Sequence, residues 1–451
     1  MRLADPICAL ALSLLSAGAA AAAPVLMISI DGLRPGDVLE ASARGVTAPT
    51  LQQMLKDGVY AKGVRNALPT VTYPNHTTLV TGVWPSVHGV SNNTTFDPQS
   101  KNYGGWYWYA ADIKVPTLWD AVHASGRTTA SLGWPVTVGA RAIDYNIPEY
   151  WRARTADDLK LDRALSTPGL PEAVAEQAHM PLANVINMGD TTIEEDEAKA
   201  RTAAAIYALK HPDFFTVHIS SLDHMEHLYG PGTPKANATL TRIDTALAAL
   251  IAAARKAESD LVVVIVSDHG FAPVQHDVNL QSAFVEAGLI TVDATGKVSA
   301  WDAMPWSAGG SAAVVLAHPE DAAVGAKTAA LLERLSNDPT TGVGRVVSRA
   351  EIAKMGGTPE ADFFVDAKIG YQFSNKLTGP LVEGGSVRGT HGYFPEHPEM
   401  RATFIAVGPS IHARGSLGEI DMRDIAPTVA ELLRVPLPSA AGHALPLEKA
   451  D

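Results

Sequence analysis

Cysteine is almost absent from this chain, and its scarcity excludes several kinds of chemistry. The only cysteine among 451 residues is Cys8, which lies in an apolar leader that we expect to be removed. The mature chain would then have no disulfide bond, no catalytic thiolate and no cysteine-ligated zinc. Runs of basic residues are missing too, and the formal net charge is −13. We therefore expect no binding to a nucleic-acid polymer or to an anionic membrane surface.

Residues 1–23 have the pattern of a secretory signal peptide. Arg2 precedes an apolar run from Ile7 to Ala20, and the alanine-rich end offers several A-x-A cleavage sites. The run is too short and too rich in small residues to span a bilayer, so we expect no stable membrane anchor. The alternative is a buried N-terminal helix. A disulfide-free exported chain of this size indicates a bacterial protein that is periplasmic or secreted.

Strand-like and helix-like patterns alternate along the rest of the chain. PVLMISI at 24–30 and LVVVIV at 261–266 are apolar runs typical of buried strands, a further strand is expected over 59–66, and helices are expected over 47–56, 74–81, 116–125, 194–209, 235–256 and 425–433. This alternation predicts an α/β fold with a mostly parallel central sheet flanked by helices. Residues 24–451 would form one catalytic domain. Residues 135–190 and 275–400 are less periodic, and we expect them to be inserted lid or cap segments.

Side chains that can bind metal follow the expected strands. Asp31, Asp223 and Asp268 each follow an apolar run, and in open parallel sheets ligands bind at the carboxyl ends of the strands. Imidazoles accompany these carboxylates: His227 lies one helical turn after Asp223, and His269 and His391 lie in SDHG and GTHG. Each residue alone is more often a helix cap, a turn former or a surface residue. Together, three carboxylates and three imidazoles are a typical ligand supply for two Zn²⁺ ions.

A threonine could complete such a centre. In TVTYPNHTTLVT, at residues 70–81, Thr72 lies two residues before Pro74, which we expect to begin a helix. The positive end of the helix and a metal ion would both stabilise an alkoxide on Thr72. Thr77, Thr78 and Thr81 are expected to bond back to helix carbonyls. Thr70 is the remaining competitor.

The motifs around Thr72 resemble those of the nucleotide pyrophosphatase/phosphodiesterase family, in the alkaline phosphatase superfamily. The family pattern is T-F-P-N-H followed by V-T-G-x-x-P-x-x-H-G-I, and this chain has TYPNH and LVTGVWPSVHGVSNN. Similarity extends in the same order to ISIDGLRP, GWP, LDHMEHLYGPG, VSDHGF and GTHGY. The resemblance implies an alkaline-phosphatase-like fold with Thr72 as the nucleophile. It also implies one zinc on Asp31, Thr72, Asp268 and His269 and a second on Asp223, His227 and His391.

The resemblance also implies how the substrate is held. Asn93 would donate to a phosphoryl oxygen, with help from the backbone amide of Thr72; the alternative for Asn93 is a plain turn residue. Tyr73 replaces the commoner phenylalanine at a position that stacks on a nucleobase. Trp134 in GWP is a further expected contact, and the family's stacking tyrosine falls near Tyr145, Tyr150 or Trp151, for which lid packing is the alternative. His224 and Glu226 replace residues that are often small, and would narrow the leaving-group side or point to solvent.

The expected function is therefore a two-zinc hydrolase. It would cleave phosphodiester or pyrophosphate bonds of small molecules such as nucleotides through a phosphothreonine. Within the superfamily the alternatives are a phosphomonoesterase, a phosphonate hydrolase or a lysophospholipid phosphodiesterase, and outside it a non-catalytic binding protein. A sulfatase is disfavoured because its nucleophile derives from Cys or Ser. Monoesterases usually aim an arginine at the extra charge, and none is near Thr72 in sequence; Tyr73, Trp134 and Tyr145 could instead pack against a second substituent.

Overall fold

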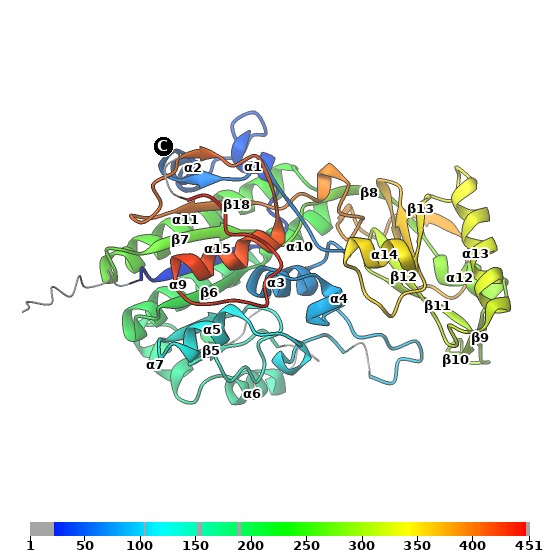
Figure 1. The fold of residues 1–451 in the computed structure, drawn as a ribbon, viewed down its shortest axis with the longest axis horizontal. Helices are drawn as coiled ribbons and strands as arrows, with labels where there is room; N and C mark the ends of the chain where they lie inside the picture. Colours follow the sequence, from blue (N-terminus) through cyan, green and yellow to red (C-terminus); the bar gives the residue numbers. More distant parts are fainter. Residues whose placement is uncertain (1–21, 103–104, 151–155, 187–190, 448–451) are drawn as a thin grey trace, which may run out of the picture.

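The computed structural model describes residues 22–102, 105–150, 156–186 and 191–447, so nearly all of the expected leader lies outside the described residues (Figure 1). Its central sheet contains, in spatial order, β19 (Gly415–Ser416), β2 (Val59–Tyr60), β18 (Phe404–Val407), β7 (Val262–Val266), β1 (Val25–Ile30), β6 (Phe214–Ile219), β4 (Thr129–Leu132) and β5 (Tyr145–Ile147). The strands from β7 to β5 are parallel, whereas β18 is antiparallel to β7 and β2. The predicted α/β fold with a mostly parallel sheet is confirmed.

Helices cover both faces of this sheet because its inner strands are apolar on both sides. Leu26, Ile28 and Ile30 of β1 belong to a core with α2 (Pro49–Asp57), α9 (Ile193–Lys210) and α11 (Pro234–Ala257). Val25 and Met27 point the other way, into a core with α3 (Thr72–Thr81), α5 (Leu118–Ala124) and α15 (Ile425–Leu432). The alternation of side chains along the strand thus sorts the helices into two layers.

Residues 272–390 form a second unit beside the central sheet, drawn in yellow-green to orange in Figure 1. Four antiparallel strands lie in the order β11 (Ala303–Ser307), β12 (Ser311–Leu316), β14 (Phe363–Ala367) and β13 (Val343–Ser348). A smaller sheet pairs β8 (Ala272–Val278) with β15 (Gly370–Phe373), β16 (Val382–Gly384) and β17 (Gly389–Thr390). The unit also contains α12 (Leu280–Glu286), β9 (Ile290–Val292), β10 (Val298–Trp301), α13 (Ala322–Asn337) and α14 (Arg349–Met355).

The remaining described elements are shorter or belong to the other expected insertion. Residues 135–190 contribute β5 to the central sheet and then form α6 (Ala156–Leu165), α7 (Leu170–Gln177) and α8 (Leu182–Ile186). The short helices α1 (Pro35–Leu39) and α4 (Pro85–His88) follow β1 and α3, and α10 (Ser221–Tyr229) follows β6. No helix among the described residues is both long and apolar enough to cross a bilayer.

Two expected boundaries are wrong. The strand expected over 59–66 is divided, because β2 pairs with β18 whereas β3 (Gly63–Arg65) leaves the sheet and pairs with β20 (Glu419–Asp421). Helix α3 begins at Thr72 rather than at Pro74, so Thr72 is its first residue. It ends at Thr81 and is capped by Gly82, whose φ of 71° is in the left-handed region that glycine tolerates best.

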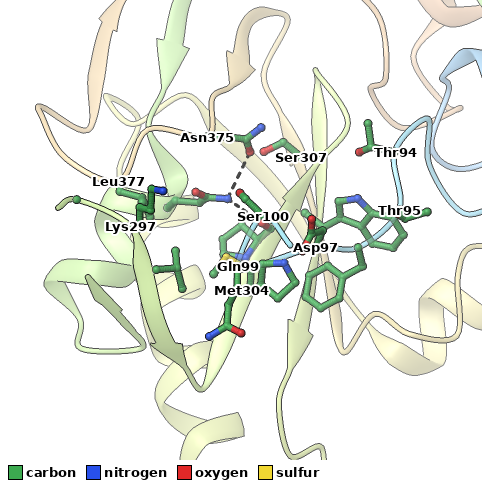
Figure 2. Close-up of a pocket in the computed structure, with 17 residues that line it drawn as sticks. Thr94, Thr95, Asp97, Gln99, Ser100, Lys297, Met304, Ser307, Asn375 and Leu377 are labelled. Atoms are coloured by element: carbon green, nitrogen blue, oxygen red, sulfur yellow. Dashed lines mark hydrogen bonds between the residues drawn. The ribbon is translucent and has the colours of Figure 1, made fainter. Parts of the chain in front are cut away.

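A cavity of about 550 Å³ lies between the loop of residues 94–100 and the second unit (Figure 2). Its other walls come from α12, the loop before β10, β11 and the segment after β15. Phe96 anchors the loop, since its ring lies 5.5 Å from the rings of both Trp301 and Trp306. Gln99 adds a hydrogen bond of 3.0 Å to the carbonyl of Ser299.

Candidate metal centre

The metal-binding side chains meet at one edge of the central sheet. Strands β6, β1 and β7 are adjacent and parallel, with Ile30 in register with Ile219 and Ser29 with Val266. The residues that follow these strands therefore emerge together. Asp31 directly follows β1, Asp223 lies in the first turn of α10, and Asp268 lies two residues after β7.

One ligand cluster contains Asp31, Asp268 and His269. Nε2 of His269 lies 3.4 Å from Oδ1 of Asp31 and 3.1 Å from Oδ2 of Asp268. The hydroxyl of Thr72 lies 3.4 Å from the same nitrogen. The nucleophile candidate and this cluster are thus in one place, as the resemblance implies.

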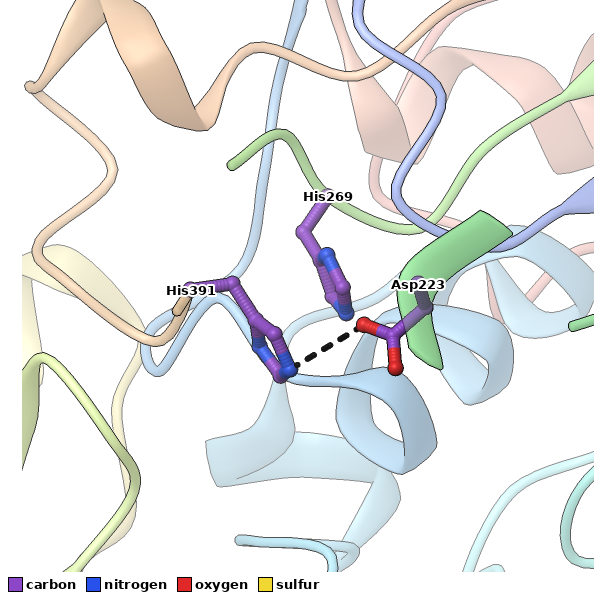
Figure 3. A group of neighbouring side chains, drawn as sticks. All are labelled: Asp223, His269 and His391. Atoms are coloured by element: carbon purple, nitrogen blue, oxygen red, sulfur yellow. Dashed lines mark ion pairs between the residues drawn. The ribbon is translucent and has the colours of Figure 1, made fainter. Parts of the chain in front are cut away.

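A second cluster contains Asp223, His269 and His391 (Figure 3). Nε2 of His391 lies 3.5 Å from Oδ1 of Asp223, and the rings of His391 and His269 stack 3.6 Å apart. His227 stands at the border of this cluster, with Nε2 3.5 Å from Oδ2 of Asp223. His269 therefore belongs to both clusters, whereas the resemblance assigned it only to the one with Asp31 and Asp268.

Hydrogen bonds fix how the three imidazoles face the centre. Nδ1 of His227, His269 and His391 lies 2.9, 3.1 and 3.1 Å from the carbonyl oxygens of Gly389, Gly270 and Thr70, respectively. A carbonyl oxygen can only accept, so each Nδ1 carries the proton and each neutral Nε2 keeps its lone pair toward the carboxylates. This is the orientation in which histidines bind metal in proteins.

Charge in the centre is unfavourable without cations. Burial, together with the charges of Asp268 and Asp223, raises the pKa of Asp31 well above its ordinary value. Burial lowers the pKa of His269 to about 3 and that of His391 well below its ordinary value. Oδ1 of Asp31 and Oδ2 of Asp268 are buried and have no hydrogen-bond partner among the described residues. Divalent cations would satisfy these oxygens, and the mixed carboxylate and imidazole donors suit zinc.

The other threonines of the motif are engaged elsewhere. Thr77, Thr78 and Thr81 donate to the carbonyls of the residues four before them, at 2.8, 3.0 and 2.7 Å, as expected. Thr70 donates to the carbonyl of Tyr393 at 2.8 Å. Of the five threonines, Thr72 is the one whose hydroxyl faces the carboxylate and imidazole groups.

Asn93 lies beside the start of α3. Its Oδ1 accepts a hydrogen bond of 2.9 Å from the backbone N–H of Tyr73. Since an N–H can only donate, the atom facing it must be the amide oxygen, and the amide NH₂ remains to donate to a ligand. The placement therefore agrees with a phosphoryl-binding role.

The aromatic residues lie differently from what the sequence led us to expect. Tyr73 and Trp134 are buried, at 1% and 0% exposure, so as placed here neither ring has a face open to a substrate. Tyr145 begins β5 in register with Ala130, and through Phe215 with Leu26 of β1. It therefore lies about five strand residues, or roughly 17 Å, from the edge where Asp31 emerges.

The two remaining stacking candidates do not replace them. Tyr150 is buried and packs against Trp108, with ring centroids 4.8 Å apart. Trp151 lies outside the described residues.

Sequence reasoning missed a buried network behind Asp31. His218, in β6, has Nε2 3.1 Å from Oδ2 of Asp31 and Nδ1 3.3 Å from Oε2 of Glu149. Glu149 in turn accepts a hydrogen bond of 2.6 Å from the hydroxyl of Tyr73. Burial alone would raise the pKa of Glu149, but the hydrogen bonds from His218 and Tyr73 outweigh it and hold the pKa below its ordinary value. One sequence signal was present: a histidine inside the buried strand FFTVHI that precedes LDHMEH.

Glu226 does not point to solvent. It is 1% exposed and lies 3.4 Å from the guanidinium of Arg34, which also pairs with Asp37 at 2.8 Å. This ion pair connects the loop after β1 to α10, so it joins the elements that carry Asp31 and Asp223. Burial raises the pKa of Glu226 well above its ordinary value despite Arg34.

Known proteins resemble this chain in sequence. A family model described as type I phosphodiesterase/nucleotide pyrophosphatase matches residues 25–394. Human ectonucleotide pyrophosphatase/phosphodiesterase family member 5 is 27% identical over 254 residues, covering 54% of this chain and 44% of that protein. Human family member 1 is 25% identical over 259 residues, covering 55% and 23%. A Schizosaccharomyces pombe protein described as an uncharacterized pyrophosphatase/phosphodiesterase is 26% identical over 253 residues, covering 55% and 45%. The match thus spans less than half of each relative.

Solved structures show the same fold. Human ectonucleotide pyrophosphatase/phosphodiesterase 5 superposes with a TM-score of 0.63 at 19% identity, covering 95% of this chain and 97% of that one. An inactive variant of the murine protein, in complex with AMP, gives a TM-score of 0.63 at 17% identity, covering 94% and 97%.

Proposed function

The chain belongs to the type I phosphodiesterase/nucleotide pyrophosphatase family of hydrolases, and from this premise we propose that it cleaves small phosphodiesters or pyrophosphates, nucleotide derivatives among them. The reaction would pass through a phosphothreonine on Thr72. The observation that carries the proposal is the position of the Thr72 hydroxyl, 3.4 Å from Nε2 of His269 and beside two groups of candidate metal ligands.

The residues of the centre divide into those that hold cations and those that hold substrate. Asp31, Asp268 and His269 would hold one Zn²⁺ together with Thr72, and Asp223, His227 and His391 would hold the other. Two zinc ions would lower the pKa of the threonine hydroxyl and neutralise charge on the attacking and leaving oxygens. The amide NH₂ of Asn93 would donate to a phosphoryl oxygen. Thr72 Oγ1 would form the bond to phosphorus as the ester bond breaks, and water would later release the phosphoryl group.

Charge around the site favours a diester over a monoester. Arg34 is held by Asp37 and Glu226, and Arg65 is exposed in β3. Neither guanidinium is therefore placed to pair with the additional charge of a monoester. The AMP complex of the murine relative supports a nucleotide as one class of substrate.

The test is a substrate panel with the zinc-loaded protein: an aryl ester of a nucleotide, a dinucleotide pyrophosphate, an aryl monoester and a lysophospholipid. We expect kcat/KM for the nucleotide diester to exceed that of the matched monoester by at least roughly 100-fold, a difference of about 2.7 kcal/mol. A faster monoester would refute the diesterase assignment and leave the family membership intact. Turnover of none of the four would favour a binding protein on this scaffold.

We also propose that the chain is exported and that residues 1–23 are removed. Mass spectrometry of the protein recovered from a bacterial periplasm or culture medium should then show a new N-terminus close to Pro24. An intact Met1 on the recovered protein would contradict this.

A further inference from the structure

Helix α10 carries Asp223 and His227, but the residue that precedes it does not cap its first turn. The first N–H groups of a helix have no partner within it, and a side chain just before the helix usually accepts from one of them. Ser220 occupies that position and makes no such hydrogen bond. Its hydroxyl instead accepts a hydrogen bond of 2.7 Å from Nζ of Lys199.

A carboxylate from a neighbouring helix caps the turn instead. Oδ1 of Asp196, in the first turn of α9, accepts from the backbone N–H of Ser220 at 3.1 Å, and Oδ2 accepts from that of Ser221 at 2.8 Å. Both oxygens are thus used at the start of α10, where a negative charge also faces the positive end of the helix. Asp223 lies two residues after Ser221, in the same turn, and projects toward His391 (Figure 3).

Lys199 holds Asp196 in this position. Its Nζ lies 3.4 Å from Oδ1 of Asp196, one turn away on α9, and the two side chains are 4% and 1% exposed. In a buried ion pair the cost of removing the charges from water offsets most of their attraction, so the pair contributes little net stability. Its effect is one of direction, since its hydrogen bonds with Ser220 and Ser221 fix where α10 begins.

We propose that Asp196, held by Lys199, is a positioning residue for the second ligand cluster: it fixes the first turn of α10 and with it the direction of Asp223. The proposal rests on the proposed function, because Asp223 would bind the second Zn²⁺ that the proposed hydrolysis requires. Asp196 supplies no ligand atom itself. It acts through the backbone N–H groups of Ser220 and Ser221.

Competition with a chromophoric chelator, which gives both zinc dissociation constants, tests the proposal without turnover. Asp196→Asn keeps the size of the side chain and one acceptor oxygen but loses the other oxygen and the charge. It should weaken the ion held with Asp223 roughly three- to tenfold, less than the 10- to 100-fold that follows loss of a group in direct contact with a ligand. Asp196→Ala, which loses both acceptors, should weaken that ion further.

The second zinc ion is the internal reference for this measurement. The ion held with Asp31 and Asp268 should bind to both Asp196 variants as it does to the original protein. His391→Ala, which removes a ligand of the ion held with Asp223, identifies which of the two constants belongs to that ion.

A matched control is available in α11. Asp244 is also 1% exposed, and its carboxylate accepts from the backbone N–H groups of Thr50 and Leu51, at 3.0 and 2.8 Å, at the start of α2. Asp244→Asn therefore removes the same kind of contact from a helix that carries none of the candidate ligands. It should lower the free energy of unfolding much as Asp196→Asn does, and it should bind both ions as the original protein does.

Unchanged binding of both ions by the Asp196 variants, equal weakening of both ions, or the same loss in Asp244→Asn would overturn the proposal. So would failure of both Asp196 variants to fold while Asp244→Asn folds, because the carboxylate would then serve the fold as a whole. Hydrolysis of bis-p-nitrophenyl phosphate is measured alongside. Turnover by the original protein without the selective loss of zinc affinity refutes the positioning role alone. The selective loss without turnover of any diester refutes the proposed function and leaves the positioning of Asp223 intact.

Discussion

Replacing Tyr73 by phenylalanine removes one oxygen atom, and we expect the change to weaken metal binding. The hydroxyl donates to Glu149 at 2.6 Å, Glu149 lies 3.3 Å from His218, and His218 lies 3.1 Å from Asp31. All four side chains are buried. The orientation of Asp31, a candidate metal ligand, thus depends on a series of contacts that begins at this hydroxyl.

The magnitude follows from the type of each contact. A hydrogen bond to a carboxylate contributes about 1.5–3 kcal/mol, and Tyr73→Phe leaves the buried Glu149 with one donor fewer. Loss of a group that directly orients a metal ligand typically lowers metal affinity about 10- to 100-fold. His218→Gln removes such a direct partner, and we expect a loss toward the upper limit. Tyr73 acts through two intervening side chains, so Tyr73→Phe should weaken one of the two ions by up to about tenfold.

Competition with a chromophoric chelator measures both zinc affinities in each variant. Tyr207→Phe is the control, because Tyr207 is fully buried and its hydroxyl has no hydrogen-bond partner among the described residues. It should bind zinc as the original protein does. If Tyr73→Phe also binds both ions with unchanged affinity, the hydroxyl does not position Asp31. If, in addition, Tyr73→Ala slows nucleotide diesters more than small alkyl diesters, the ring stacks on the base and the position of Tyr73 described above does not persist in the complex.

Three further predictions concern the nucleophile, the ions and pH. Thr72→Ala should remove nearly all turnover while retaining most zinc, and Thr72→Ser should retain partial activity; a Thr72→Ala protein with a tenth of the original rate would place the nucleophile elsewhere. Exhaustive chelation should abolish activity and zinc should restore it; by elemental analysis, His269→Ala should lower mainly the occupancy of the ion held with Asp31 and Asp268, whereas His391→Ala should lower mainly that of the other ion. Burial lowers the pKa of His88 to about 3. Below about pH 6.5 this histidine is therefore protonated in the unfolded chain, whereas in the folded chain it stays neutral until about pH 3. As the pH falls from about 6.5 to 3, His88 should therefore reduce the free energy of unfolding by up to about 1.4 kcal/mol for each pH unit. Chemical denaturation of the metal-free proteins should show that the free energy of unfolding of His88→Gln falls less steeply with pH than that of the original protein. An equal dependence on pH in the two proteins would contradict the lowered pKa of His88.

The sequence was sufficient for the centre of the fold because each signal there is local. The strand β7 is a continuous apolar run and β1 a nearly continuous one, and a parallel sheet aligns their carboxyl ends, so the acidic residues that follow them had to meet. Asp31, Asp223 and Asp268 could be placed together without any knowledge of long-range contacts. The division of the expected strand 59–66 into β2 and β3 was not visible, because it depends on pairing with β18 and β20, which lie more than 300 residues later.

The second layer of the site could not be inferred, because its contacts join residues that share no local pattern. Glu149 and His218 are 69 residues apart, and Tyr73 and Glu149 are 76 apart. From the sequence, Tyr73 is an aromatic substitute for phenylalanine, and nothing near it in the chain indicates a partner for its hydroxyl. In the structure, that hydroxyl is the feature that matters, since its partner is a buried carboxylate.

This pairing gives the substitution at position 73 a physical reason. A carboxylate at 7% exposure, such as Glu149, needs donors to remain ionised, and His218 supplies only one of them. With phenylalanine at 73, Glu149 would lose its shortest hydrogen bond and would be stabilised less well as a partner for His218, which in turn faces Asp31. The Tyr73 hydroxyl and the Glu149 carboxylate therefore act as a unit. Either group alone would stabilise the fold little, because the hydrogen bond between them needs both. The same unit explains why the ring is buried, because a tyrosine whose hydroxyl reaches a carboxylate inside the core cannot also present its face to a base outside it.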